Sequence, residues 1–122
     1  MVNDTVSKGY GSNVKHKKIQ DDLETRLKNY GYKVYTNINY YNDDTHRVIG
    51  EIDVLAIKTD KQGYMRDVRL YEVKSGSDGY SHAQKQLKRA RNYFSPNKQG
   101  VIPKLVYVTA DRHGAMKARR VR

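Results

Sequence analysis

Two carboxylates and one amine lie within stretches that otherwise have the composition of buried strands. Asp53 precedes the apolar residues 54–57, and Glu72 and Lys74 lie within the run 70–74. An unpaired carboxylate in a dry interior raises the free energy by several kcal/mol, so such residues need a partner. Mg²⁺ prefers carboxylate oxygens as ligands and would offset that cost. These residue types therefore predict a metal site that acts on a phosphate ester.

The spacing of these residues predicts how the chain brings them together. Side chains alternate along a strand, so Glu72 and Lys74 point to one face and Val73 to the other. An antiparallel hairpin across the turn-forming Gln62-Gly63 would bring Asp53 and Glu72 to one cation. The Lys74 ammonium would then orient the attacking water or stabilise the charge on the scissile phosphate.

A purely structural role is the alternative for the same residues. Asp53 and Glu72 would then pair with Lys or Arg across a half-exposed sheet, and Lys74 would be a solvated strand end. A surface strand alternates apolar and polar residues, however, and residues 52–57 do not alternate. The pattern therefore favours the metal site.

The same two strands resemble a known catalytic signature. Gly-Glu-Ile-Asp-Val-Leu at residues 50–55, followed by Tyr-Glu-Val-Lys-Ser at residues 71–75, is similar to the signature of the PD-(D/E)xK nuclease superfamily. The superfamily includes restriction enzymes, RecB-type exonucleases and archaeal-type resolvases of four-way (Holliday) DNA junctions. The resemblance covers roughly residues 20–110, and the small, basic chain looks most like the resolvases.

The resemblance implies roles for individual residues. Asp53 and Glu72 would bind Mg²⁺, for which Mn²⁺ can substitute, and the main-chain carbonyl of Val73 would be a further metal ligand. Lys74 would position the nucleophile or stabilise the transition state. The substrate would be branched duplex DNA, and the protein would act as a homodimer.

The first helix is expected over residues 19–30, with Gly31 as its stop. Its apolar residues recur at helical spacing and form one stripe: Ile19, Leu23, Leu27 and Tyr30. In the superfamily this helix often contributes an acid to the metal site. By analogy with the resolvases the acidic position falls on Gln20, whereas Glu24 lies one turn later on the same flank. We expect Glu24 to be the third carboxylate; an exposed helix residue is the alternative.

A second helix is expected from Asp78 or Ser81 to about Phe94. Its buried stripe consists of four residues: Ala83, Leu87, Ala90 and Phe94. Four cations lie elsewhere around it and either contact phosphate or are simply solvated: Lys85, Lys88, Arg89 and Arg91. Related nucleases often place a glutamine on this helix that holds water or substrate near the metal. Gln86 is the better match and Gln84 the reserve, and either is otherwise a good helix former.

Composition narrows the classes of partner. The 122 residues include 24 Lys and Arg against 13 Asp and Glu, a net charge of +11, which points to a polyanion such as nucleic acid. No cysteine is present, which excludes disulfides, thiolate zinc sites and iron–sulfur clusters. No apolar run is long enough to span a bilayer, so we expect no membrane partner and a cytoplasmic protein, in a host cell if the chain is viral.

The order of the expected elements predicts the fold class. Strands are expected at 32–41, 48–58, 67–74 and 104–110, so the order αβββαβ gives an α/β protein. The resemblance implies a restriction-endonuclease-like mixed central sheet flanked by helices. Residues 1–18 are expected to form a basic flexible N-terminal arm, and residues 19–122 a single nuclease domain. The basic end, 112–122, is compatible with a helix or an arm.

Together these patterns predict a metal-dependent DNA endonuclease, most similar to a structure-selective four-way junction resolvase. One alternative is a restriction-like or repair nuclease that cuts linear or flapped DNA. Another is a non-catalytic DNA-binding module that retains the nuclease fold.

Overall fold

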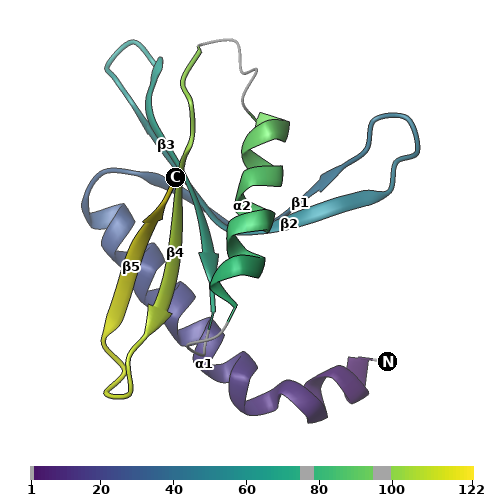
Figure 1. Cartoon of the computed structure of the whole chain (residues 1–122). Coiled ribbons are helices and arrows are strands. Elements are labelled where there is room, and N and C mark those ends of the chain that lie inside the picture. The colour runs from purple at the N-terminus through teal and green to yellow at the C-terminus, as the bar shows by residue number, and fades with distance from the viewer. Residues whose placement is uncertain (1, 75–78, 95–99) are drawn as a thin grey trace.

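The computed structural model describes the backbone of residues 2–74, 79–94 and 100–122, with side chains from Val14 onward. A five-stranded mixed sheet carries one helix on each face (Figure 1). The elements in chain order are α1 Val2–Asn29, β1 Lys33–Tyr41, β2 Val48–Thr59, β3 Met65–Val73, α2 Tyr80–Phe94, β4 Lys104–Ala110 and β5 Met116–Val121.

The strands lie in the sheet in chain order, from β1 at one edge to β5 at the other. β1, β2 and β3 pair antiparallel, and α2 returns the chain so that β4 lies parallel to β3. This confirms the predicted β2–β3 hairpin and the predicted crossover. The observed order αβββαββ adds one strand to the prediction, because the basic end of the chain forms β5 antiparallel to β4.

The helix α1 corrects the predicted boundary at residue 19. It begins at Val2, so the segment expected to be a separate arm is helical. Ile19, Leu23 and Leu27 are buried as predicted, but Tyr30 is 72% exposed. The helix ends at Asn29 and Gly31 adopts a φ of +91°, which carries Tyr30 out of the stripe.

Two apolar cores hold the helices against the sheet. On one face α1 covers Val54, Ala56, Tyr71, Val73 and Val108. On the other face the predicted α2 stripe of Ala83, Leu87 and Ala90 is buried against Ile52, Leu70, Leu105 and Tyr107. No helix in the described part of the chain is both long and apolar enough to cross a membrane.

An irregularity in β2 sets up the candidate site. Ile52 packs in the α2 core and Val54 in the α1 core, although two residues apart on a regular strand they would share a face. Opposite this point on β1, Asn37 has a positive φ of 54°, and the pairing of β2 with β3 starts only at Val54. As a result, the three consecutive residues 52–54 are all buried. This explains why the sequence of β2 does not alternate apolar and polar residues at this point. Beyond it β1 and β2 project as a two-stranded ribbon (Figure 1).

Candidate active site

Asp53 and Glu72 lie where β2 separates from β3. Both are buried, with only 6% and 5% of their surface exposed. Since Asp53 lies beyond the paired part of the two strands, its side chain replaces the main chain as a partner: the Val73 N–H donates to Asp53 Oδ2 at 2.8 Å. The two acids predicted from the sequence are therefore brought together across the end of the hairpin.

The two carboxyl groups interact electrostatically in one dry environment. Burial, reinforced by the charge of Asp53, raises the pKa of Glu72 to about 7, and the opposing effect of Lys74 is smaller. The raised pKa of Glu72 means that this dry environment disfavours full negative charge on both acids. A divalent cation would offset that charge.

Lys74 completes the cluster from the end of β3. Its Nζ lies 3.3 Å from Glu72 Oε2, and its side chain is 28% exposed. Its main-chain N–H donates to the Val108 carbonyl of β4 at 2.9 Å, which fixes the strand end. The structure thus places an ammonium beside one carboxylate and within reach of solvent.

Helix α1 contributes Gln20, the position that the analogy with the resolvases indicated, and His16, which the sequence analysis did not assign to the site. Gln20, 5% exposed, donates from Nε2 to the main-chain carbonyl of Asp53 at 2.8 Å and to Asn37 Oδ1 at 3.0 Å. His16 lies one turn earlier, and its Nε2 is 3.4 Å from Asp53 Oδ2. The hydrogen bond with Asp53 raises the pKa of His16 despite its partial burial. His16 and Gln20 are four residues apart and therefore lie on one face of the helix, and this spacing is the pattern in the sequence that could have identified them together.

The third carboxylate predicted on this helix is not part of the cluster. Glu24 Oε2 pairs with Lys28 Nζ at 2.8 Å along α1, and the Glu24 side chain is 29% exposed. The residue one turn earlier, Gln20, is the one that faces Asp53. The assignment of Glu24 is therefore corrected: the helix position over the site carries an amide in place of an acid.

Gln86 of α2 is half-buried, and its Oε1 has no hydrogen-bond partner among the described residues. A buried amide oxygen without a donor is unusual, because the unmade hydrogen bond costs about 1–3 kcal/mol. The oxygen is therefore free to accept from water or a ligand. A role of Gln86 or of Gln84 near a metal stays a prediction.

The donor set suits a hard divalent cation. Among the described residues no group of three His, Cys, Asp or Glu side chains could by itself hold a metal. Asp53 and Glu72 would have to be supplemented by the Val73 carbonyl, water and a phosphate oxygen. Mg²⁺ is commonly held in this way, by one or two carboxylates with water and substrate phosphate.

No protein-family model, no curated protein and no solved structure matches this chain. The residues and their geometry are therefore the whole basis for assigning a function.

Proposed function

We propose that the protein is a metal-dependent DNA endonuclease of the PD-(D/E)xK type, selective for four-way junctions. The observation that carries the proposal is the convergence of Asp53, Glu72 and Lys74 at the buried end of the β2–β3 hairpin. Buried acids beside an ammonium have no evident structural purpose, since the burial of each charge is costly. The αβββαββ order, which contains the expected αβββαβ, and the +11 charge support the same assignment.

Each residue of the cluster has a defined task. Asp53, Glu72 and the Val73 carbonyl would hold the cation. When bound, Mg²⁺ or Mn²⁺ would supply Lewis-acid stabilisation of the charge that develops on the phosphate. Lys74 Nζ, 3.3 Å from Glu72 Oε2, donates a hydrogen bond to the attacking water or to a phosphate oxygen.

The residues of α1 hold the acids in place. Gln20 bonds the carbonyl of Asp53 and so fixes the irregular turn of β2 at that residue. His16 contacts the Asp53 carboxylate from the solvent side and restrains its rotation. Such support matters because a catalytic group displaced by about 1 Å loses on the order of 10²-fold in rate.

The preference for a four-way junction rests on the resemblance to the resolvases, which also implies a homodimer. A non-catalytic DNA-binding module is the second candidate, and one observation favours it. Gln20 occupies the helix position at which related nucleases often carry an acid, so the cluster has one carboxylate fewer. Such a module would bind DNA with steep salt dependence and release no product.

The test is a cleavage assay on a labelled four-way junction and a linear duplex of matched sequence, with Mg²⁺ or with chelator. Wild type is compared with Asp53→Asn and with Asp43→Asn, a control acid exposed in the β1–β2 turn. Paired nicks near the junction centre that require metal and Asp53 but not Asp43 support a resolvase. Equal cutting of both substrates indicates a general nuclease.

Binding without any metal-dependent product would refute the enzyme assignment. Near wild-type cleavage by Asp53→Asn would refute the site.

A further inference from the structure

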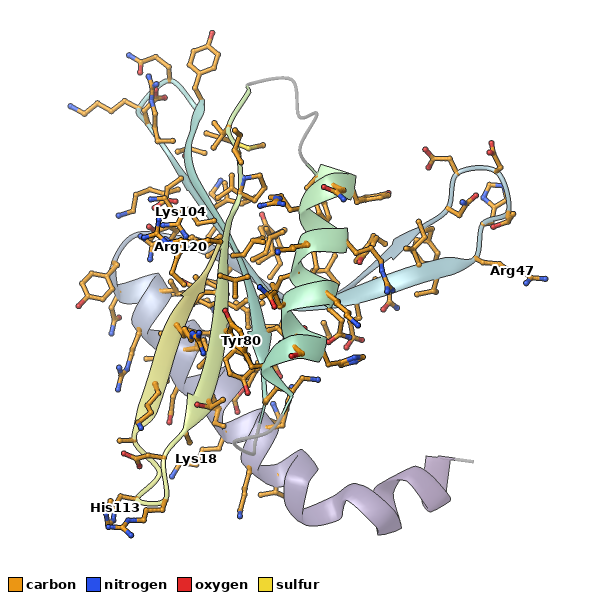
Figure 2. All side chains as sticks on the ribbon, viewed as in Figure 1. Lys18, Arg47, Tyr80, Lys104, His113 and Arg120 are labelled. Atoms are coloured by element: carbon orange, nitrogen blue, oxygen red, sulfur yellow. The ribbon has the colours of Figure 1, made fainter. Side chains whose placement is uncertain are left out.

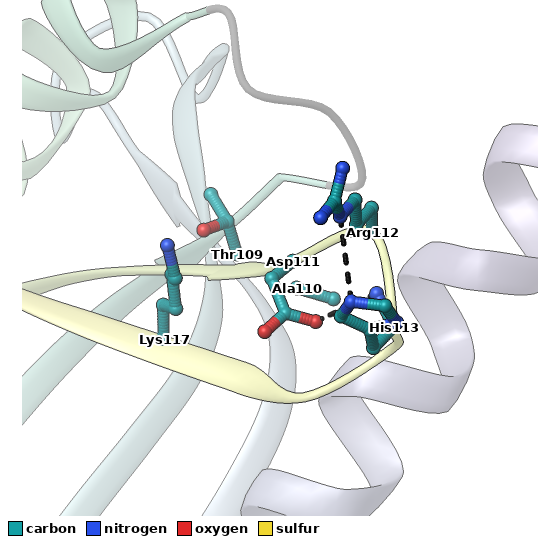
Figure 3. A pocket seen from close by; sticks show the side chains of 6 residues that line it. All are labelled: Thr109, Ala110, Asp111, Arg112, His113 and Lys117. Carbon is teal, nitrogen blue, oxygen red and sulfur yellow. Dashed lines mark hydrogen bonds between the residues drawn. The ribbon is translucent and has the colours of Figure 1, made fainter.

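The hairpin that joins β4 to β5 is a stiff loop beside the candidate active site. The Asp111 carboxylate accepts the main-chain N–H groups of His113 and Ala115 at 2.8 and 2.9 Å. The main-chain N–H of Asp111 also donates to the carbonyl of Ala115 at 2.8 Å. A hollow lies along this hairpin (Figure 3), lined by Thr109, Ala110, Asp111, Arg112, His113 and Lys117.

The hairpin and the acids lie at the same end of the sheet. β4 runs parallel to β3, with Glu72 opposite Tyr107, and the N–H of Lys74 bonds the carbonyl of Val108. The chain enters the hairpin two residues later, after Ala110. The opposite end of the sheet holds the β2–β3 turn (Figure 1).

The side chains of β5 show which face of the sheet is involved. Lys117 pairs with Thr109, and Arg119 with Tyr107. Tyr107 belongs to the α2 core, and the Arg119 guanidinium lies 3.8 Å from the ring centroid of Tyr80, the first residue of α2. Lys117 and Arg119 therefore lie on the α2 face.

Glu72 lies on that face as well, because it alternates with Leu70 of the α2 core. Two strand spacings of about 4.8 Å place β5 roughly 10 Å from β3.

Three cations of this hairpin have no acidic partner in the part of the chain that the structure describes. Among the described residues none of Arg112, Lys117 and Arg119 forms an ion pair. The nearby Asp111 carboxylate accepts hydrogen bonds from main-chain N–H groups of the turn instead. On the other face of the sheet, Arg69 and Lys104 both pair with Asp67. The region next to the acids is thus a site of unbalanced positive charge on a stiff support.

We propose that Arg112, Lys117 and Arg119 form a phosphate track that holds the DNA backbone beside the scissile bond. The ligand is the phosphodiester backbone of nucleic acid, so the inference rests on the proposed function. Arg119 lies opposite Tyr107, which lies opposite Glu72, so it is roughly 10 Å from the acid, or about three nucleotide steps of 3.4 Å along a duplex axis. Lys117 and then Arg112 lie farther along the hairpin. The track therefore binds phosphates three or more nucleotides from the bond that is cut.

Two features suit the track to phosphate. Tyr80, at the start of α2 (labelled in Figure 2), packs edge-on against Tyr107 with ring centroids 5.3 Å apart. This contact holds the ring on which Arg119 stacks. The Thr109 hydroxyl, in the row of Lys117, adds a neutral donor. The competing explanation is that charged residues on an edge strand merely block pairing with another sheet.

The experiment measures DNA affinity as a function of salt, in chelator, by fluorescence anisotropy. The variant Arg112→Gln/Lys117→Gln is compared with Lys33→Gln/Lys61→Gln, which removes two exposed cations from the opposite end of the sheet. Each phosphate contact contributes about 0.9 to the slope of log affinity against log salt. The hairpin variant is expected to weaken binding and to reduce the slope by about 1.8, and the control to reduce it little.

A slope unchanged in the hairpin variant, or reduced equally in the control, would overturn the track. Phosphate ethylation interference gives a second readout: the contacts three or more nucleotides from the cut position must be those that disappear. If the wild type cleaves no DNA, the proposed function is wrong, but the difference in slope between the two variants remains. Failure of the proposed function can therefore be distinguished from failure of the phosphate track. Absence of DNA binding by the wild type would overturn both.

Discussion

Glu72 makes the stability of the metal-free protein depend on pH. Its pKa is raised from an ordinary 4.5 to about 7 in the folded protein, chiefly by burial and then by the charge of Asp53. Between these values the folded protein holds a proton that the unfolded chain has released. The free energy of unfolding therefore decreases as the pH rises through this window. Full ionisation costs about 3 kcal/mol, at about 1.4 kcal/mol for each pKa unit.

The assay is urea unfolding followed by circular dichroism, in chelator, from about pH 5 to about pH 6.5, where Glu72 should remove about 2 kcal/mol. The window ends at pH 6.5, the ordinary pKa of His16, so that the titration of His16 interferes little. Because the pKa of His16 is raised in the folded protein, its contribution to stability is lost only as the pH rises above this window. The variant Glu72→Gln keeps a hydrogen-bond donor toward Asp53 but cannot ionise, so its stability should be nearly flat. The matched control is Glu51→Gln, an exposed acid on the same strand as Asp53, which should retain the wild-type slope.

A divalent cation should reverse the effect. Mg²⁺ binds the ionised carboxylates, so its stabilisation of the wild type should be larger at about pH 8 than at about pH 5.5 and absent in Glu72→Gln. An unchanged pH slope in Glu72→Gln would refute the argument that Glu72 is protonated in the metal-free fold. Equal stabilisation by Mg²⁺ at both pH values would refute its role as a ligand.

Three further changes probe the cluster and its support. Gln20→Ala leaves the buried carbonyl of Asp53 without its donor, so the free energy of unfolding should fall by about 1–3 kcal/mol, measured by urea unfolding. Lys74→Met removes the charge that lowers the pKa of Glu72, so the pH-dependent loss of stability should begin at the same pH but extend to higher pH and become larger, and cleavage should cease; an unchanged upper limit of the window would count against their contact. Burial raises the pKa of Asp67, but the hydrogen bonds from Tyr32 and Arg69 outweigh it and hold the value low, so this stability is present at neutral pH and lost on acidification. Asp67→Asn should therefore be less stable by about 2 kcal/mol at neutral pH and approach the wild type at low pH.

Local patterns in the sequence determined most of the secondary structure. The two-residue alternation of 33–41, the apolar runs of β2, β3 and β4, and the spacing of Leu23 with Leu27 and of Ala83 with Leu87 all depend on near neighbours. The separation of two residues between Glu72 and Lys74 likewise fixed their common face. The hairpin between β2 and β3 followed from the turn residues that separate them. Such features require no knowledge of distant contacts.

Tertiary structure decided the features that depend on residues far apart in the chain. The basic end has no apolar run of its own, and it became β5 only because β4 offered a free edge. Gln20, in place of Glu24, reached the site because the rotation of α1 is set by its packing on Val54 and Tyr71.

The orientation of Asp53 was decided in the same way. It depends on the point at which β2 leaves β3, where the Val73 N–H takes a carboxylate in place of a main-chain partner. The sequence determined which residue types are available for chemistry. Only the packing of α1 and the departure of β2 from the sheet determined which of them meet, because both are long-range contacts that no local spacing encodes.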